Sequence, residues 1–310
     1  MTLGRKYAKL LTELFGESMS QSSPKYSNYR KILKCIKFNG SSKEVLQLKS
    51  LFLLLCATPA GRTIIQKVLN TNNKTIELSF NKKLTNSGYF HFESHAIEIT
   101  HIATDIPEMT KEQKLKSQIM MARILAHELQ HVATSSVSEQ MLASANNLKD
   151  YSFACRLSEA NAYMWEQIFY EEILFKKRPR ILYLYHHPND APGYLRSAPD
   201  ENNPDFQKYN GAIIYTYKFR DTPEFRKQFV KNALSGKNSL VDLSVNEEIK
   251  HFSPDTPPGP SPDAFYNMIP YFLDDMQINT SVDEVLHMAD IQRPKHSKFM
   301  QIMKNLIHIR

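Results

Sequence analysis

One short stretch of this 310-residue chain restricts what it can fold into more than any other. Residues 124–133 read ILAHELQHVA, so His127 and His131 stand four positions apart in an apolar run, with Glu128 between them. On a helix, side chains four positions apart lie on one face, so the two imidazoles can reach the same metal ion. The pattern predicts a Zn²⁺ site with Glu128 beside the metal, where this carboxylate can take a proton from a metal-bound water.

The residues around this motif favour a metal site over a coincidence. From 118 to 133 the chain is apolar almost all round, which predicts a helix buried on most sides. In such a helix the three polar side chains of the motif would be buried without obvious partners, which is costly unless a metal ion satisfies them. The alternative interpretation is that the HExxH pattern is a coincidence. A coincidental motif would more often lie on a solvated helix.

A third ligand has to come from elsewhere in the chain, because a catalytic zinc ion takes three protein ligands and leaves one position open. A second predicted helix carries Glu159, 28 positions after His131 and next to small residues that allow close approach of another backbone. Glu159 is the predicted third ligand, and Glu166 and Glu139 are the competing carboxylates. Asn161 is a candidate for a hydrogen bond to a ligand histidine.

The composition is ordinary for a globular protein. The chain is 42% hydrophobic and 23% charged, and its length allows one large domain or two modest ones. The formal net charge is +7, but the basic residues are spread along the chain, which favours a solvated surface over a nucleic-acid site. The three cysteines lie far apart, as is typical of free thiols in a reducing compartment, and predict neither disulfides nor a cysteine zinc site.

Neither a secretory signal nor a membrane span is expected. Residues 1–15 are basic and leucine-rich, but Glu13 interrupts them and no small-residue cleavage site follows. The longest apolar run, 51–57, is too short to cross a bilayer. We therefore expect a cytoplasmic protein. The alternative is a bacterial effector that is delivered into a host cell without a Sec signal peptide.

Hydrophobic periodicity predicts an α+β fold in three regions. They are an N-terminal helical region (1–74), a central core (75–180) and a mostly helical C-terminal region with long proline-containing loops (181–310). In the first region, helices are predicted at 26–37, 41–55 and 59–70. In the last, helices are predicted at 209–219 and 223–234.

The central core changes from the period of a helix to that of a strand. Apolar and polar residues alternate at 76–80, 89–92 and 97–102, which predicts three short strands in a small, mostly antiparallel sheet. Thr110 and Gln113 then resemble a capping box that starts the motif helix. Three hydroxyl residues at 134–136 predict the end of this helix.

This order of elements resembles the zincin superfamily of metallopeptidases, in which a sheet precedes a helix bearing HExxH and a second helix supplies the third zinc ligand. The resemblance implies a zincin-like core. It also implies a gluzincin-like site, with Glu128 as the general base and with three zinc ligands, His127, His131 and Glu159. Gluzincins often carry an aspartate four residues after the ligand glutamate, and this chain departs from that pattern with Tyr163.

Residues 56–172 carry this resemblance and are also similar to an uncharacterised group of bacterial proteins regarded as metallopeptidases. The resemblance implies a zinc-dependent metalloendopeptidase whose protein or peptide substrate adds as a strand along the sheet edge beside the motif helix. Zincins stabilise the oxyanion with a Tyr, His or Arg, for which the candidates by position are Tyr185, His186, Tyr215 and Tyr217. The alternatives are a zinc-binding pseudo-enzyme and a helical partner-binding protein without catalysis. No nucleic-acid partner is expected.

Overall fold

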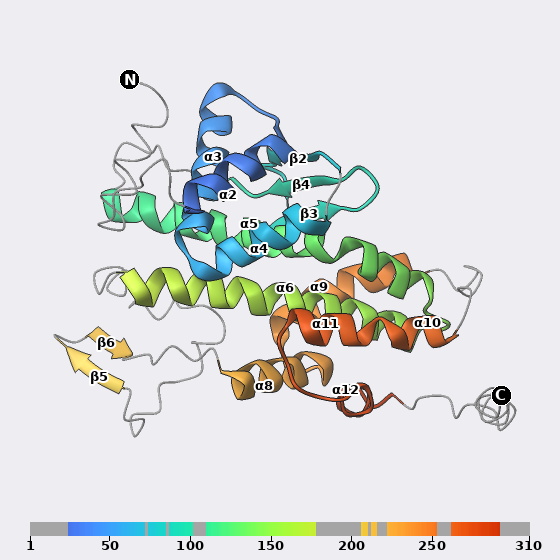
Figure 1. Ribbon diagram of the computed structural model, residues 1–310. Coiled ribbons are helices and arrows are strands. Elements are labelled where there is room, and N and C mark those ends of the chain that lie inside the picture. The colour runs from blue at the N-terminus through green and yellow to red at the C-terminus, as the bar shows by residue number, and fades with distance from the viewer. Residues whose placement is uncertain are drawn as a thin grey trace, which may run out of the picture.

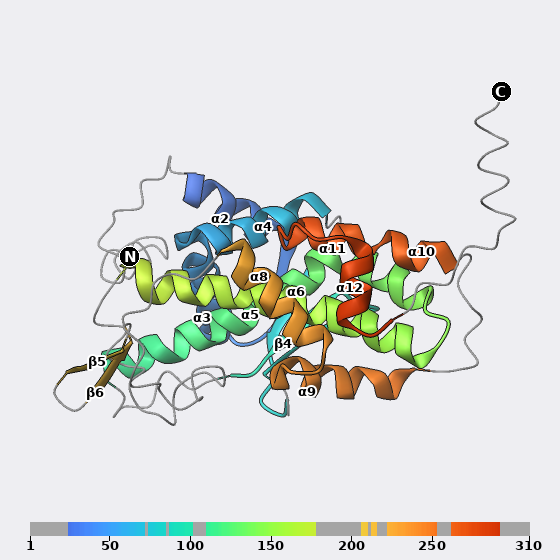
Figure 2. The same ribbon diagram turned by 90° about the horizontal axis from the view of Figure 1, so that it is seen from below.

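Two long helices, α5 (Lys111–Ala143) and α6 (Leu148–Lys177), run side by side through the middle of the molecule (Figures 1 and 2). A small sheet and the N-terminal helices pack against α5, and helices of the C-terminal region pack against α6. The computed structural model describes residues 24–71, 74–84, 87–101, 110–177, 206–209, 212–215, 222–252 and 262–291.

Three N-terminal helices precede the sheet: α2 (Pro24–Cys35), α3 (Ser42–Ala57) and α4 (Pro59–Thr71). Ser41 caps α3 in a reciprocal capping box with Glu44. The corner between α3 and α4 is tight, because a Cβ on Gly61 would lie 2.2 Å from the carbonyl oxygen of Leu55. The predicted helices at 41–55 and 59–70 are therefore confirmed.

The sheet has four strands in the order β1-β2-β4-β3. The strands are β1 (Ile36–Phe38), β2 (Ile76–Phe80), β3 (Gly88–His91) and β4 (Ala96–Ile99). The three predicted strands are present, and β1 takes the last residues of the helix predicted at 26–37. Strand β3 forms one edge of the sheet and packs against α5.

The predicted mostly antiparallel arrangement is wrong, because the sheet is mixed. Strand β4 pairs with β3 in an antiparallel hairpin, but it also inserts between β3 and β2 and runs parallel to β2. Strand β1 adds a second parallel pairing at the other side of β2. Sequence alternation gives the strands but not their neighbours, so it could not distinguish this order from a simple meander.

The motif helix α5 begins where the sequence predicts and ends later. Thr110 and Gln113 form the predicted reciprocal capping box. The predicted end at 134–136 is wrong, because the hydroxyl groups there donate to carbonyl oxygens of the same helix. Thr134 donates to Gln130 over 3.1 Å and Ser135 donates to Val132 over 3.0 Å, so neither hydroxyl competes with the helical backbone.

The described residues of the C-terminal region are mostly helical, with one exception. Its helices are α8 (Pro223–Leu234), α9 (Ser239–Glu248), the 3₁₀ turn η3 (Ile249–His251), α10 (Pro262–Asn267), α11 (Ile269–Asp275) and α12 (Val282–Met288). The helix predicted at 209–219 is wrong. Strands β5 (Phe206–Tyr209) and β6 (Ala212–Tyr215) pair antiparallel there, and the intervening Asn-Gly dipeptide is a strong hairpin signal.

One hydrophobic cluster joins residues of all three predicted regions, from Tyr29 in α2 to Ile291 after α12. A smaller cluster between α6, α8 and α9 contains Cys155, Ala160, Ala233, Val241 and Val245. The helices and the mixed sheet make the fold α+β, as predicted. The boundaries predicted between the three regions, at residues 74 and 180, stay a prediction. Among the described helices, none alone has the length and apolar character to cross a bilayer, and α3 and α4 meet that test only as a pair bent by 111°.

Candidate metal centre

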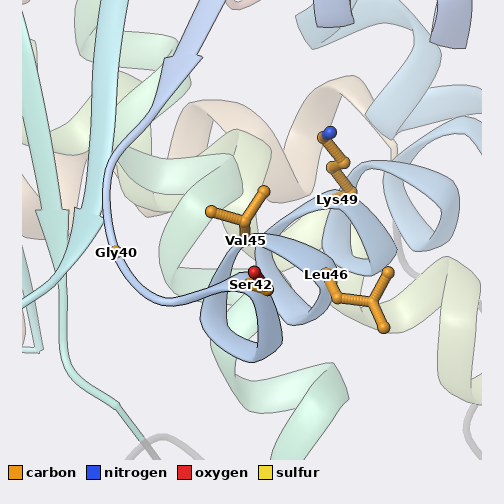
Figure 3. A pocket seen from close by; sticks show the side chains of 5 residues that line it. All are labelled: Gly40, Ser42, Val45, Leu46 and Lys49. Atoms are coloured by element: carbon orange, nitrogen blue, oxygen red, sulfur yellow. The ribbon is translucent and has the colours of Figure 1, made fainter.

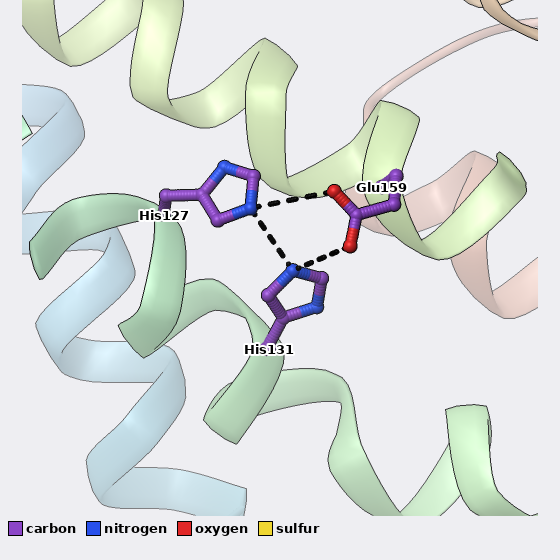
Figure 4. A group of neighbouring side chains, drawn as sticks. All are labelled: His127, His131 and Glu159. Carbon is purple, nitrogen blue, oxygen red and sulfur yellow. Dashed lines mark hydrogen bonds and ion pairs between the residues drawn. The ribbon is translucent and has the colours of Figure 1, made fainter. Parts of the chain in front are cut away.

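Helices α5 and α6 bring together the three residues that the sequence predicts as metal ligands (Figure 4). The Nε2 atoms of His127 and His131 are 3.1 Å apart. The carboxylate of Glu159 lies 3.5 Å from His127 Nε2 through Oε2, and 3.2 Å from His131 Nε2 through Oε1. All three residues are buried, with at most 9% of their surface exposed. They form a group that could hold a metal ion.

The spacing of these atoms fits a tetrahedral metal site. Zinc binds nitrogen and oxygen ligands at about 2.0 Å, which places the ligand atoms of a tetrahedron about 3.3 Å apart. The three separations, 3.1, 3.2 and 3.5 Å, bracket that value. In addition, Glu159 Oε2 is a buried atom that accepts no hydrogen bond. The donor set and the unsatisfied oxygen therefore both fit a bound cation.

Glu166, a competing candidate for the third ligand, contacts the far side of the His127 ring instead. Its Oε2 lies 2.9 Å from His127 Nδ1, and its Oε1 contacts the guanidinium of Arg123. A carboxylate at Nδ1 fixes the ring orientation and leaves Nε2 directed at the centre. Glu139, the other candidate, is exposed on the last turns of α5. Only Glu159 of the three carboxylates faces both Nε2 atoms.

Tyr163 occupies the position where gluzincins often carry an aspartate, and its ring packs on His127. The two ring centroids are 4.4 Å apart, and the Tyr163 hydroxyl forms a hydrogen bond of 3.1 Å with Ser244 of α9. Glu166, two turns of α6 after Glu159, contacts the other ring nitrogen of His127. This contact was not predicted, because sequence spacing alone does not show which nitrogen a carboxylate reaches.

His131 has a weaker partner than His127 at its Nδ1. The hydroxyl of Ser158 lies 3.4 Å from His131 Nδ1 and 3.3 Å from the hydroxyl of Ser138. Asn161, predicted to contact a ligand histidine, is fully buried, but its side-chain amide has no hydrogen-bond partner among the described residues. The two ligand histidines are therefore held differently, one by a carboxylate and one by a hydroxyl.

Glu128 lies between the metal centre and the sheet edge. Its carboxylate is buried and comes close to the backbone of Gly88 in β3. Burial raises the pKa of Glu128 to about 7, against the opposing effect of His127 and His131. A general base works best when its pKa is near the working pH, so this carboxylate suits proton transfer at neutral pH.

The centre carries more negative than positive protein charge. It contains the carboxylates of Glu128, Glu159 and Glu166, and the cations that oppose them are the guanidinium of Arg123 and, in metal-free protein, the protonated imidazole of His127. Burial raises the pKa of Glu159, but His131 and His127 outweigh it and hold this pKa well below the usual range. Burial lowers the pKa of His127, but Glu159 and Glu166 outweigh it and hold this pKa well above the usual range.

A separate hollow of about 280 Å³ lies at the first turns of α3 (Figure 3). Its lining residues are Gly40, Ser42, Val45, Leu46 and Lys49, of which only Lys49 ionises. This hollow therefore offers no acid–base or ligand pair. Three of the candidates for oxyanion stabilisation, Tyr185, His186 and Tyr217, lie outside the described residues. Tyr215 ends β6, where the structure describes only the backbone.

Comparison of the chain with protein-family models, curated protein sequences and solved structures found no match. The chemistry of the metal centre is thus the basis on which a function can be inferred.

Proposed function

We propose that the protein is a zinc-dependent metalloendopeptidase of the gluzincin-like type, which hydrolyses peptide bonds of a protein or peptide. The observation that carries this proposal is the pairing of a three-ligand group, His127, His131 and Glu159, with a buried carboxylate, Glu128, at its side. Two imidazoles and one carboxylate are a ligand set that catalytic zinc uses. Bound zinc would supply Lewis acidity at the water and at the scissile carbonyl.

Glu128 would act as the base and then as the acid. Its pKa of about 7 allows it to accept a proton from the attacking water and to pass that proton to the leaving amine. Glu166 and Arg123 would hold the His127 ring, so that Nε2 stays directed at the centre during the reaction. The proton that Glu128 takes from the water is thus the one that the leaving amine receives.

The outer edge of β3, with which no described strand pairs, is where an extended substrate would bind. The Thr100 N–H donates to the Ser87 carbonyl over 2.8 Å, so alternate pairs along β3 and β4 are hydrogen-bonded. Gly88 and Phe90 lie in the other pairs, and their N–H and C=O groups point away from β4. An extended peptide can add to these groups as a strand, which requires no free chain end and therefore favours an endopeptidase.

The site of action is proposed from the state of the thiols. The three cysteines form no disulfide in the structure, and two of them are buried. Free thiols suit a reducing compartment. We propose that the enzyme acts in cytoplasm, either that of the producing cell or, as a secreted bacterial effector, that of a host.

A zinc-binding pseudo-enzyme is the second candidate, and the burial of the centre favours it. The three ligands and Glu128 are between 5% and 9% exposed, as expected when a metal ion serves folding rather than turnover. In that case zinc would bind, but the protein would cleave nothing.

Replacing Glu128 with Gln tests the proposal. The zinc-loaded wild type and Glu128→Gln are incubated with a cell-derived peptide mixture, and new termini are identified by mass spectrometry. We expect the variant to keep its zinc and to lose cleavage by about 100-fold or more, since it lacks the proton acceptor. Glu139→Gln, on an exposed position of the same helix, is the matched control and should cleave like wild type. Equal cleavage by wild type and Glu128→Gln would contradict the peptidase, and no cleavage by either would favour the pseudo-enzyme.

A further inference from the structure

Gly88 is a glycine whose backbone conformation does not require one. The described glycines with positive φ are Gly40 and Gly236, and Gly88 is not among them. It begins β3, where glycine weakens a strand because it adds conformational entropy to the unfolded chain and has no side chain to pack. The reason for a glycine at this position must therefore be space.

The space that a side chain at residue 88 would need is occupied by side chains of α5. A Cβ on Gly88 would lie 2.6 Å from Glu128 Oε1, 2.6 Å from Ile124 Cγ2 and 3.1 Å from Glu128 Cδ. Ile124 and Glu128 are one turn apart on the face of α5 that packs against β3. Gly88 thus lies where the motif helix packs tightly against the edge strand, and two of the three atoms nearest to an added Cβ belong to the Glu128 carboxylate.

We propose that Gly88 is a positioning residue for Glu128, because its missing side chain lets the carboxylate lie against the edge strand. This role rests on the proposed peptidase activity. The N–H and C=O of Gly88 face the outer edge of β3, so the carboxylate lies beside the strand position that a substrate backbone would pair with. Any side chain at residue 88 would separate the base from the bound peptide.

The Glu128 side chain is the part that would move if a side chain were added. The next residue on the same face of β3, Phe90, is buried in the hydrophobic core, and its packing there holds the strand in place. The backbone of α5 is held between the sheet and α6. The end of the glutamate is flexible, and it would recede by about 0.8 Å to restore an ordinary contact of 3.4 Å. A displacement of about 1 Å at a reacting group can lower the rate about 100-fold.

Gly88→Ala tests this role through kinetics and zinc affinity. We expect kcat to fall about 100-fold, with a smaller change in KM, while zinc affinity stays within about threefold because no ligand is touched. In a Glu128→Gln background, adding Gly88→Ala should cause no further loss, since both changes act through one group. Ser87→Ala, at the exposed neighbouring position, is the matched control and should leave kcat unchanged. Wild-type kcat in Gly88→Ala, or additive losses in the double variant, would overturn the proposal.

Two further measurements separate this role from a folding defect and from the peptidase proposal. Gly88→Ala combined with Ile124→Ala removes the clash with Ile124 and keeps the clash with Glu128, so it should fold and stay as slow as Gly88→Ala. Recovery of kcat in this double variant would contradict the role. Crystal structures of wild type and Gly88→Ala give a readout that does not depend on activity. A carboxylate displaced from residue 88 supports the positioning, and an unmoved carboxylate with a displaced strand overturns it, whether or not the wild type cleaves peptides.

Discussion

Two buried polar clusters use different faces of the same long helices, and they differ in what completes them. The Asp275 cluster consists of Lys67, Gln130, Trp165 and Asp275. Its carboxylate accepts hydrogen bonds from Lys67 over 2.8 Å and from Gln130 over 2.6 Å, and the backbone carbonyl of Asp275 accepts one from Trp165 over 3.3 Å. The Lys67 ammonium also lies 3.8 Å from the centroid of the Trp165 ring.

The Asp275 cluster is complete without any added ion, and the metal centre is not. In the Asp275 cluster the carboxylate pairs with Lys67, and the nearby Arg226, which lies over the same Trp165 ring, donates to oxygens of Met276 and Gln277. Only the uncharged Gln130 Oε1 lacks a hydrogen bond there. The metal centre has three carboxylates against Arg123 and a protonated His127, and it contains an unsatisfied oxygen of Glu159. Buried charges are normally paired. The comparison therefore separates a cluster whose carboxylate is fully paired from one that could hold a cation.

The largest effect is expected from breaking the complete cluster. Asp275→Ala leaves the Lys67 ammonium buried without its partner and should lower the free energy of unfolding by about 3–5 kcal/mol. Urea denaturation with and without zinc measures this, and zinc affinity should not change. Adding Lys67→Met should restore most of the loss, because it removes the unpaired charge. An undiminished stability in Asp275→Ala would contradict the structural role of this cluster.

Replacing Glu128 with Gln in zinc-free protein is expected to raise the free energy of unfolding, whereas Asp275→Ala lowers it. The folded-state pKa of about 7 lies above the ordinary 4.5, so the folded protein holds this proton more tightly than the unfolded chain. The stability that this group contributes is therefore present below pH 4.5 and is lost as the pH rises through 7. Since one pKa unit corresponds to about 1.4 kcal/mol, Glu128→Gln should be more stable than wild type by roughly 3 kcal/mol at pH 8. Both proteins should be equally stable near pH 4.5, and a difference that does not change with pH would contradict this origin.

A smaller effect is expected when the carboxylate behind His127 is removed. Glu166→Gln loses the charged contact to Nδ1 and should weaken zinc binding about 10- to 100-fold, while one zinc ion per chain still binds at saturation. Competition with a chelator of known affinity measures this change. Wild-type zinc affinity in Glu166→Gln would show that this contact does not hold the ring for the metal.

The smallest effect is expected on the His131 side. Ser158→Ala removes a neutral hydrogen bond of 3.4 Å, which is worth less than a charged contact of 2.9 Å. Zinc affinity should therefore fall by less than about fivefold. A larger loss in Ser158→Ala than in Glu166→Gln, measured by the same competition, would reverse the assigned order of the two supports.

The metal centre was largely predictable because its parts depend on helix periodicity. Four-residue spacing predicts that His127 and His131 lie on one helix face, and the apolar run around them predicts their burial. Both features are present in α5. Glu159 was predicted from the need for a third ligand. The contacts of Arg123 and Ser158 were missed, because they depend on how α5 and α6 are rotated against each other.

The strand order and the end of the motif helix were not predictable in the same way. Alternation predicts a strand at Ile76–Phe80 but does not show that Ile36–Phe38 joins it from the N-terminal region. Hydroxyl residues at 134–136 read as a helix end, but Thr134 and Ser135 donate to their own helix when the surroundings favour it. These features depend on tertiary packing, which local pattern does not contain.

The most direct test of the central claim is the zinc content of the purified protein. After loading with zinc and exhaustive dialysis, elemental analysis should find one zinc ion per chain in the wild type and in Asp275→Ala, and almost none in His131→Ala. Zinc well below one equivalent in the wild type, or an equal content in His131→Ala, would contradict a metal centre built from His127, His131 and Glu159.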